Sequence, residues 1–269
     1  MKTIFLRVIK DRYLSLIIFL AANFGFAWMY IGLFPYIQSQ AEELQKLIET
    51  YPQGFLEVFG GNVQLSFSHV ENYLAMEMFS FIWPILIISL VVGMGAFSVA
   101  GEIEKGTMET ILAQPISRAK IFFAKYLAGF FNLFVFTTIS VLSIILLILV
   151  YGINFQLAHF LAIWLVGILF SGAIFSLASF LSAVFSDRGK VIFFTVGLVV
   201  LMYAFNILSS LKKSVEDLKF LSFFHYFNPN LILGDGKIEW LTLVVFLGAI
   251  ILFFLLGLII FKRRDISVS

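Results

Sequence analysis

A charged stretch of the sequence, Gly101 to Lys125, lies between two long apolar runs and offers side chains for binding another protein. It carries seven charged residues, and the apolar runs on both sides are long enough to cross a bilayer. Read as a helix, the stretch has one charged face that holds Glu102, Lys105 and Glu109. The roughly opposite face is apolar and holds Ile103, Met108 and Ile111. The pattern predicts a short amphipathic helix that forms a docking surface at the mouth of a membrane domain.

The predicted helix should end near Pro115. Proline has no backbone N–H and restricts the conformation of the preceding Gln114. Ser117 is then suited to cap a second helix that runs into the next apolar segment. We therefore expect a helix, a break and a second helix between residues 101 and 125.

The charged stretch resembles the cytoplasmic signature of permease subunits of type-2 ABC transporters. The resemblance rests on a Glu-x-Glu-Lys-Gly-Thr-x-Glu string that begins at Glu102 and on the Pro-Ile-Ser-Arg string that begins at Pro115. Six apolar spans, an outer loop after the first span and a Phe-Asn-Pro segment before the last extend it over nearly the whole chain. In that family the stretch forms a coupling helix seated in a cleft of a separate ATPase subunit. The resemblance implies that nucleotide-driven movement passes to the spans through Glu102, Glu104, Lys105, Gly106, Thr107, Glu109, Pro115 and Arg118.

The composition excludes a soluble globular domain. Hydrophobic residues make up 61% of the chain and charged residues only 13%, against about 25% charged residues in soluble domains. The net charge of +2 is too small to suggest nucleic-acid binding, and the absence of cysteine excludes disulfides and thiolate metal sites. We expect an all-α integral membrane protein whose 269 residues form a single permease domain.

Six segments of the sequence are predicted to be transmembrane helices. Their expected ranges are 13–34, which Pro35 should end, and 78–100, 126–151, 159–185, 191–211 and 240–261. Small residues in the fourth segment permit close helix packing; they are Gly172, Ser176, Ser179 and Ala183. The remaining expected parts are an amphipathic interfacial segment (1–12), an outer loop (38–73), the cytoplasmic coupling region (101–125) and an outer re-entrant region (212–239).

The distribution of basic residues predicts the orientation. Thirteen Lys and Arg residues lie on the side that carries both termini and the coupling region, and five lie on the other side. The positive-inside rule therefore predicts that both termini and the coupling region are cytoplasmic. We expect a multi-pass protein of the cell membrane, most simply a prokaryotic cytoplasmic membrane.

The sequence indicates that energy for transport comes from a partner. The spans contain almost no ionisable residues, which argues against a carrier driven by an ion gradient. A phosphate-binding loop requires Gly-x4-Gly-Lys-Ser/Thr, and the nearest match, Gly236-Lys237, is followed by Ile238. We therefore expect no catalytic residues and no cofactor in this chain, with ATP and Mg bound by an ATPase subunit.

A tight polar turn before the fifth span carries Asp187, Arg188 and Lys190. The resembling family has a second, smaller contact with the ATPase at this position. The alternative interpretation is a basic turn that only sets the topology. Both interpretations place the turn in the cytoplasm.

Two further groups of residues are candidates for the transport route. By resemblance, the path lies near spans two and five of two facing copies, which makes Tyr203 and Asn206 candidates; hydrogen bonds between helices are the alternative. The aromatic segment after the fifth span could close the outer mouth or anchor the chain at the interface. Its candidate gate residues are Phe223, Phe224, Phe227 and Pro229.

The three histidines do not predict a metal site. His69, His159 and His225 fall on the expected outer side, but no two of them have the spacing of metal ligands. Serine-hydrolase and zinc-protease motifs are also missing from the sequence. We expect no metal and no enzymatic activity in this chain.

These observations favour the membrane-spanning subunit of an ATP-driven ABC exporter. Two ATPase subunits and a second permease copy, identical or not, would complete it. The complex would move a substrate across the membrane or deliver work to an extracytoplasmic pathway. The alternative is a stand-alone membrane scaffold or lipid-handling protein without an ATPase partner.

Overall fold

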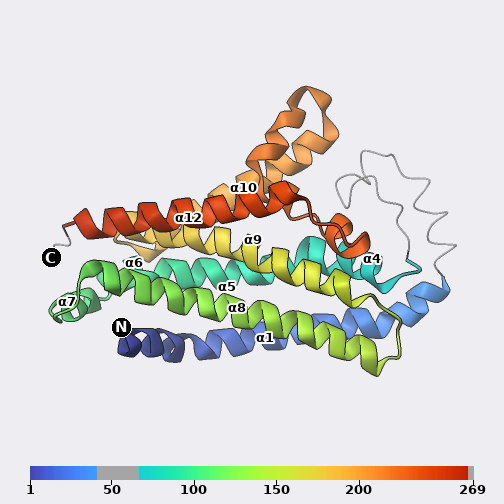
Figure 1. The fold of residues 1–269 in the computed structure, drawn as a ribbon, viewed down its shortest axis with the longest axis horizontal. Helices are drawn as coiled ribbons and strands as arrows, with labels where there is room; N and C mark the ends of the chain where they lie inside the picture. Colours follow the sequence, from blue (N-terminus) through green and yellow to red (C-terminus); the bar gives the residue numbers. More distant parts are fainter. Residues whose placement is uncertain (41–66, 266–269) are drawn as a thin grey trace.

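The structure is a computed structural model that describes residues 1–40 and 67–265, and every regular element in these two ranges is helical. Six helical segments in the described part are long and apolar enough to cross a membrane. They are α1 (Lys2–Ser39), the segment Val70–Ser98, α8 (Arg118–Val150), α9 (Leu157–Val184), α10 (Arg188–Leu211) and α12 (Trp240–Arg263). The prediction of an all-α integral membrane protein with six spans is confirmed (Figure 1).

The second span combines two kinds of helix. It begins with α4 (Val70–Leu74), widens into the π-helix η1 (Ala75–Ile82) and continues as α5 (Trp83–Ser98). Pro84 occupies the first turn of α5. The sequence predicted a start at residue 78, so the span begins about two turns earlier than expected.

Helix α9 is the centre of the bundle and packs against α5, α8, α10 and α12. Its small residues allow neighbouring helices to approach closely, as predicted. A Cβ atom added to Gly95 of α5 would lie 2.5 Å from the Cβ atom of Ala178 in α9, and one added to Gly172 would lie 3.0 Å from Ile250 in α12. The close packing of α5 and α12 on α9 therefore depends on side chains no larger than those present.

A buried hydrogen-bond chain connects three spans. The indole N–H of Trp83 in α5 donates to Ser140 in α8 (2.9 Å), and the Ser140 hydroxyl donates to Asn23 in α1 (2.8 Å). All three side chains are buried. Hydrogen bonds of this kind fix the rotation of helices where the surroundings are apolar.

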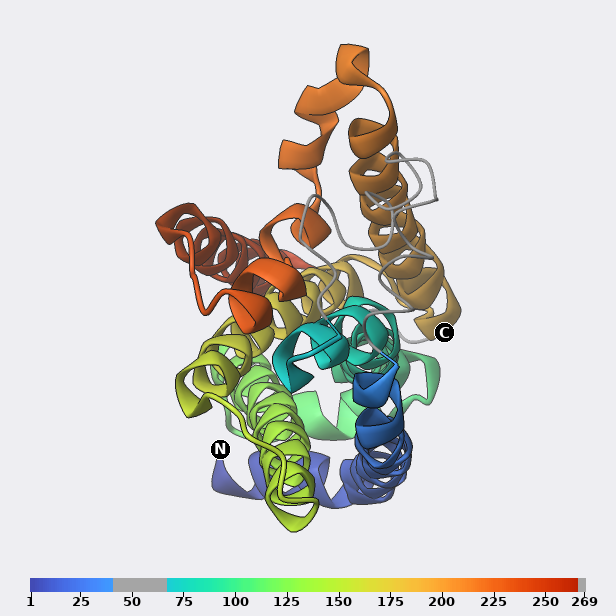
Figure 2. The same ribbon diagram turned by 90° about the vertical axis from the view of Figure 1, so that its right-hand side faces the viewer.

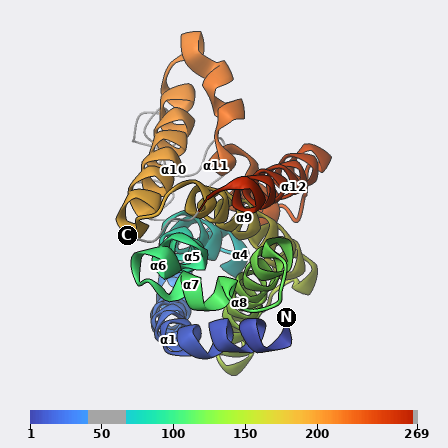
Figure 3. The same cartoon turned by 90° about the vertical axis from the view of Figure 1, so that its left-hand side faces the viewer.

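Both termini lie at the same end of the bundle (Figure 1), as an even number of spans requires. The short helices α6 (Ala100–Glu104) and α7 (Thr107–Leu112) lie at this end as well. Viewed from this end, the first turns of α1 run across the bundle before the helix turns along it (Figure 3). Whether these turns lie in the headgroup layer, and which end is cytoplasmic, stay predictions.

The opposite end of the bundle carries short helices between α10 and α12. They are the 3-10 helix η2 (Lys213–Leu221), α11 (Phe223–Tyr226) and the π-helix η3 (Asn230–Gly234). Figure 2 shows that the far end of α10 and η2 protrude from the bundle, whereas α11 returns toward α12. Whether residues 212–239 form the expected re-entrant region stays a prediction.

The expected end of the first span at Pro35 is wrong. Pro35 lies inside α1, which continues to Ser39. A proline fits the helical φ angle and removes one backbone hydrogen bond, which need not end a helix. Of the expected outer loop at 38–73, residues 41–66 lie outside the described residues.

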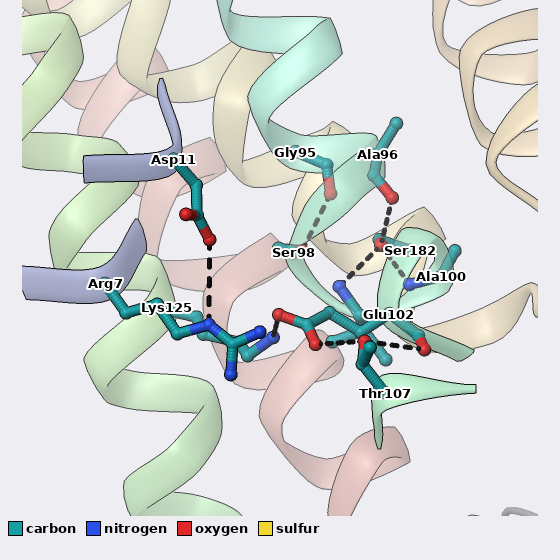
Figure 4. Close-up of polar contacts among 11 residues, drawn as sticks. Arg7, Asp11, Gly95, Ala96, Ser98, Ala100, Glu102, Thr107, Lys125 and Ser182 are labelled. Atoms are coloured by element: carbon teal, nitrogen blue, oxygen red, sulfur yellow. Dashed lines mark hydrogen bonds and ion pairs between the residues drawn. The ribbon is translucent and has the colours of Figure 1, made fainter. Parts of the chain in front are cut away.

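The chain bends between α5 and α6 at Val99, and a serine of α9 stabilises the bend (Figure 4). Val99 leaves the helical conformation with φ −126° and ψ −58°. The buried hydroxyl of Ser182 accepts the N–H groups of Val99 (3.1 Å) and Ala100 (2.9 Å) and donates to the carbonyl of Ala96 (3.1 Å). The backbone groups freed by the bend are thus satisfied by one side chain.

Replacing Ser182 by alanine should destabilise the bend. Ser182→Ala leaves two buried N–H groups without their acceptor, which should cost about 1–3 kcal/mol of folding free energy. The measurement is the thermal unfolding midpoint of the purified chain in detergent. Ser179→Ala is the matched control, because Ser179 is buried one turn away and its hydroxyl has no partner among the described residues. Equal midpoints for the two variants would contradict the role of Ser182.

Candidate functional site

The charged stretch folds as two short helices and not as the single amphipathic helix that was predicted. Helix α6 ends at Glu104 and α7 begins at Thr107, with Gly106 between them at φ +70°. This left-handed conformation is readily adopted by glycine and strained for residues with a Cβ atom. The sequence analysis singled out Gly106 through the resemblance but missed this conformational reason for a glycine.

Two of the three residues on the apolar side of the stretch are buried, and Ile103 is half-buried. Met108 and Ile111 of α7 are fully or nearly buried and pack in one cluster with Ile121 and Phe122 of α8 and Phe261 of α12. Helix α7 is therefore held against the ends of two spans by apolar contacts. The predicted break also occurs, because α7 ends at Leu112 and α8 begins after Ser117. Ser117 stands at the N-cap position, although its side chain makes no capping hydrogen bond.

Glu102 is not on an exposed face, contrary to the prediction. Its carboxylate lies 2.7 Å from the ammonium group of Lys125 in α8, and only 18% of its side chain and 2% of the Lys125 side chain are exposed. The Thr107 hydroxyl donates to the second carboxylate oxygen of Glu102 (2.7 Å), which ties α6 to the first residue of α7 (Figure 4). The helical-face argument failed because the chain turns at Gly106, so residues 102 and 109 do not share one helix axis.

Two effects act on the pKa of Glu102. Burial alone raises the pKa of a carboxyl group. The charge of Lys125 and the hydrogen bonds from Lys125 and Thr107 outweigh burial, so the pKa of Glu102 lies below its ordinary value. The carboxylate is therefore ionised at neutral pH and holds the charge of Lys125.

The other residues of the predicted coupling set lie at the surface. Glu104, Lys105, Glu109 and Pro115 are exposed. Arg118, at the start of α8, is partly buried and donates to the backbone carbonyl of Arg264 beyond α12. The site thus has an exposed rim, formed by these four residues, above residues that are bonded to the spans.

The two stretches that the sequence assigned to cytoplasmic contacts meet in the structure. The carboxylate of Glu104 in α6 accepts the backbone N–H of Arg188 at the start of α10 (2.8 Å). Asp187 caps α10 by accepting the N–H of Lys190 (2.9 Å). A carboxylate that accepts the unpaired N–H groups of a first helical turn stabilises the start of the helix. Helix α10 therefore begins directly beside α6.

Arg264 is a structural residue of this region that the sequence analysis missed. Its guanidinium group donates to the carbonyls of Ala183 (2.8 Å) and Phe185 (3.0 Å) and to the hydroxyl of Ser186. These acceptors end α9, so Arg264 joins the end of α12 to the end of α9. The basic run after the sixth span was read only as a topology signal, and no feature of its sequence distinguishes Arg264 from Arg263.

Phe97 of α5 is the centre of a cluster of cations that was also missed. The guanidinium carbon of Arg12 lies 3.7 Å from the centre of the Phe97 ring, that of Arg188 lies 4.6 Å away, and the ammonium nitrogen of Lys105 lies 5.1 Å away. A cation over an aromatic face is attracted by the ring. The first turns of α1, the α6–α7 junction and the start of α10 thus meet at one side chain.

The candidates for the transport route lie far from this region along the spans. Tyr203 of α10 lines an apolar cavity of about 430 Å³ between the second span and α10, whereas Asn206 is not among its lining residues. Phe224 lines the same cavity and contacts the Tyr203 ring edge-on at 5.0 Å. Phe227 is buried and stacks on Phe170 of α9 at 4.5 Å. The roles of these residues, and of Phe223 and Pro229, stay predictions.

The described residues contain no group of three or more His, Asp or Glu side chains placed to hold a metal ion. His159 instead lies 2.8 Å from the Leu233 carbonyl through its Nδ1 atom, which joins α9 to η3. The His225 imidazole is partly buried beside Lys219, and both effects lower its pKa. These contacts give both histidines a structural role at the end of the bundle opposite α6 and α7.

Replacing one member of the Glu102–Lys125 pair should destabilise the protein more than replacing both members. Glu102→Gln leaves a buried ammonium group without its partner, and the loss of one member of such a pair costs about 3–5 kcal/mol. The double variant Glu102→Gln/Lys125→Met removes both charges and should unfold at a higher temperature than Glu102→Gln. The measurement is the unfolding midpoint of the four proteins of this cycle.

The pH dependence of the same cycle gives an independent check. A carboxyl group whose pKa is lowered on folding contributes stability above its unfolded pKa of about 4.5 and loses it as the pH falls toward the folded value. The stability difference between the unmodified chain and Glu102→Gln should therefore be constant near neutral pH and shrink below about pH 4.5. A difference that is constant down to pH 3 would contradict the pairing.

The family comparison agrees with this arrangement. A family model described as ABC-2 family transporter protein matches residues 5–266, nearly the whole chain. No curated protein matches the sequence. Members of such a family are membrane subunits of ABC transporters that associate with an ABC ATPase, which confirms the resemblance carried by the charged stretch. With its six spans, this multi-pass membrane protein belongs to the ABC-2 family of transporter proteins.

Proposed function

We propose that this chain couples ATP hydrolysis in a separate ABC ATPase to movement of a substrate across the membrane or to work on an extracytoplasmic pathway. The proposed coupling element is the α6–α7 unit, residues 100–112. ATP and Mg would be bound by the ATPase subunits, two of which would act on a pair of permease chains. Coupling requires that the partner binds two conformations of the chain with different affinity.

The attachment of α6 to the spans supports this proposal most directly. Glu102 is paired with Lys125 of α8, Glu104 accepts from the backbone of α10, and Ser182 of α9 binds the backbone where α6 begins. A force applied to α6 would therefore act on three spans besides α5. Glu109 and Pro115 stay free at the surface, where a partner can contact them.

The apolar cavity beside α10 supports a transport route between the second and fifth spans. It contains few polar groups, among them Tyr203 and Ser89, and it suits an apolar or amphiphilic substrate. Helix α10 is mostly exposed in the single chain, with Phe193, Val200 and Leu201 on its surface. A second permease copy facing this cavity would cover the exposed side of α10.

Reversing the charge of Glu109 should uncouple the partner without unfolding the chain. Glu109 is exposed, so Glu109→Arg leaves no buried charge unpaired but opposes whatever basic group contacts it. We expect at least a tenfold loss of co-purifying ATPase activity with an unchanged unfolding midpoint. The assay is ATP hydrolysis by the complex isolated with the tagged chain from its native host.

Glu239→Arg is the control for that assay. Glu239 is exposed at the start of α12, at the other end of the bundle, and its reversal changes the net charge equally. Full activity of Glu109→Arg would remove the coupling assignment. A chain that never co-purifies with an ATPase would favour the scaffold or lipid-handling alternative.

The pairing of two copies through α10 can be tested by cross-linking, because the chain has no cysteine. Val200→Cys places a thiol at the edge of the apolar cavity, at a side chain that is 59% exposed. A short bismaleimide should join two such chains in native membranes. Leu149→Cys on α8 is equally exposed and should give monomers. Dimers with Leu149→Cys alone would place the interface elsewhere.

A further inference from the structure

The structure contains a second cavity, at the end of the bundle that carries α6 and α7, and its lining is positively charged. It encloses about 460 Å³ between α1, α5, α6 and α8. Four cationic side chains line it, those of Arg7, Arg12, Lys105 and Lys125, together with the carboxylates of Asp11 and Glu102. The charges of the lining do not cancel.

The two carboxylates of the cavity already have partners. Glu102 lies 2.7 Å from Lys125, and Asp11 lies 3.7 Å from Arg7 on the next turn of α1 (Figure 4). Arg12 and Lys105 remain, and they converge with Arg188 on the ring of Phe97. In the described ranges no carboxylate oxygen forms an ion pair with any of these three cations.

Like charges gathered on one aromatic ring repel one another, and an anion between them would remove the repulsion. The cations come from three segments far apart in the sequence, so the fold itself brings them together. Guanidinium and ammonium groups are the donors that bind phosphate groups, the guanidinium with two parallel N–H groups. Arg12 and Lys105 line the cavity, and Arg188 reaches the Phe97 ring from outside its lining.

The other walls of the cavity indicate what is attached to the phosphate. Val8, Met94 and Phe175 provide an apolar part of the lining. Arg12 stands directly before the apolar run of α1, whose Leu14 and Ile18 are exposed on the single chain. A cationic cluster directly before an apolar span is expected at the depth where polar headgroups give way to acyl chains.

We propose that Arg12, Lys105 and Arg188 bind the phosphate of an anionic phospholipid headgroup, with the apolar wall of the cavity against the start of its acyl chains. The lipid would connect the first turns of α1 to the α6–α7 unit and to the start of α10. Its presence would then favour the arrangement of these elements seen in the structure.

The test uses the full-length chain, purified in a neutral detergent and stripped of lipid, with no ATPase present. Its outcome is therefore independent of the proposed coupling function. Bound phosphatidylglycerol is counted by native mass spectrometry, and its affinity is measured from the rise in the unfolding midpoint with added lipid. Phosphatidylcholine, which has a phosphate but no net charge, and inorganic phosphate are the two comparison ligands.

Removing two of the cations should weaken lipid binding selectively. We expect Arg12→Gln/Lys105→Gln to bind phosphatidylglycerol at least tenfold more weakly than the unmodified chain. Lys10→Gln/Lys120→Gln is the matched control, because it removes two exposed cations at the same end of the bundle that do not line the cavity. The control should change the affinity less than twofold.

A charge-preserving variant separates loss of the site from loss of the fold. Arg12→Lys/Lys105→Arg should retain binding within about threefold, since both cations remain. If millimolar inorganic phosphate binds at these cations and phosphatidylglycerol does not, the phosphate site is supported, but its ligand is a soluble phosphate and not a lipid. Equal affinities of the Gln variant and its control would overturn the proposal.

Discussion

The rest of the structure depends on one constraint between α5 and α8. The chain must leave the membrane after α5 and enter it again at α8 with its backbone polar groups hydrogen-bonded. In apolar surroundings every N–H and C=O must find a partner within the protein. The bend at Val99 frees such groups, and the Ser182 hydroxyl binds two of the donors and one carbonyl. The position of α6 is thereby fixed from α9, the helix on which most other spans pack.

Three different interactions then hold the same small unit. Apolar packing of Met108 and Ile111 seats α7, the buried pair of Glu102 and Lys125 holds α6 to α8, and the Glu104 carboxylate reaches the backbone of α10. A unit bound in this way moves together with the ends of the spans. The exposed rim is left free for a partner, which is the separation of roles that a coupling element requires.

The sequence predicted the features that depend on regular patterns. The six spans followed from the length of the apolar runs, and the close packing of α9 followed from its small residues, because both patterns are local and periodic. The density of charge singled out the stretch that holds the candidate site. The failures were at irregular points. Helical periodicity placed Glu102 and Glu109 on one face, but Gly106 turns the chain between them. The links made by Arg264, Ser182 and Phe97 join residues about 80 to 90 positions apart, and one sequence contains no signal for them.

The π-helix η1 changes the direction in which side chains point between the first and second halves of the second span. A π-turn takes in one residue more than an α-turn, and one residue in an α-helix corresponds to a rotation of about 100°. The side chains of α4, which pack near η3, are thus out of phase with those of α5, which face α9. Residues of α4 and α5 that follow regular α-helical spacing therefore point to different sides of the same span. The surface of α4 can change in sequence while the faces of α5 that pack on α9 keep their register.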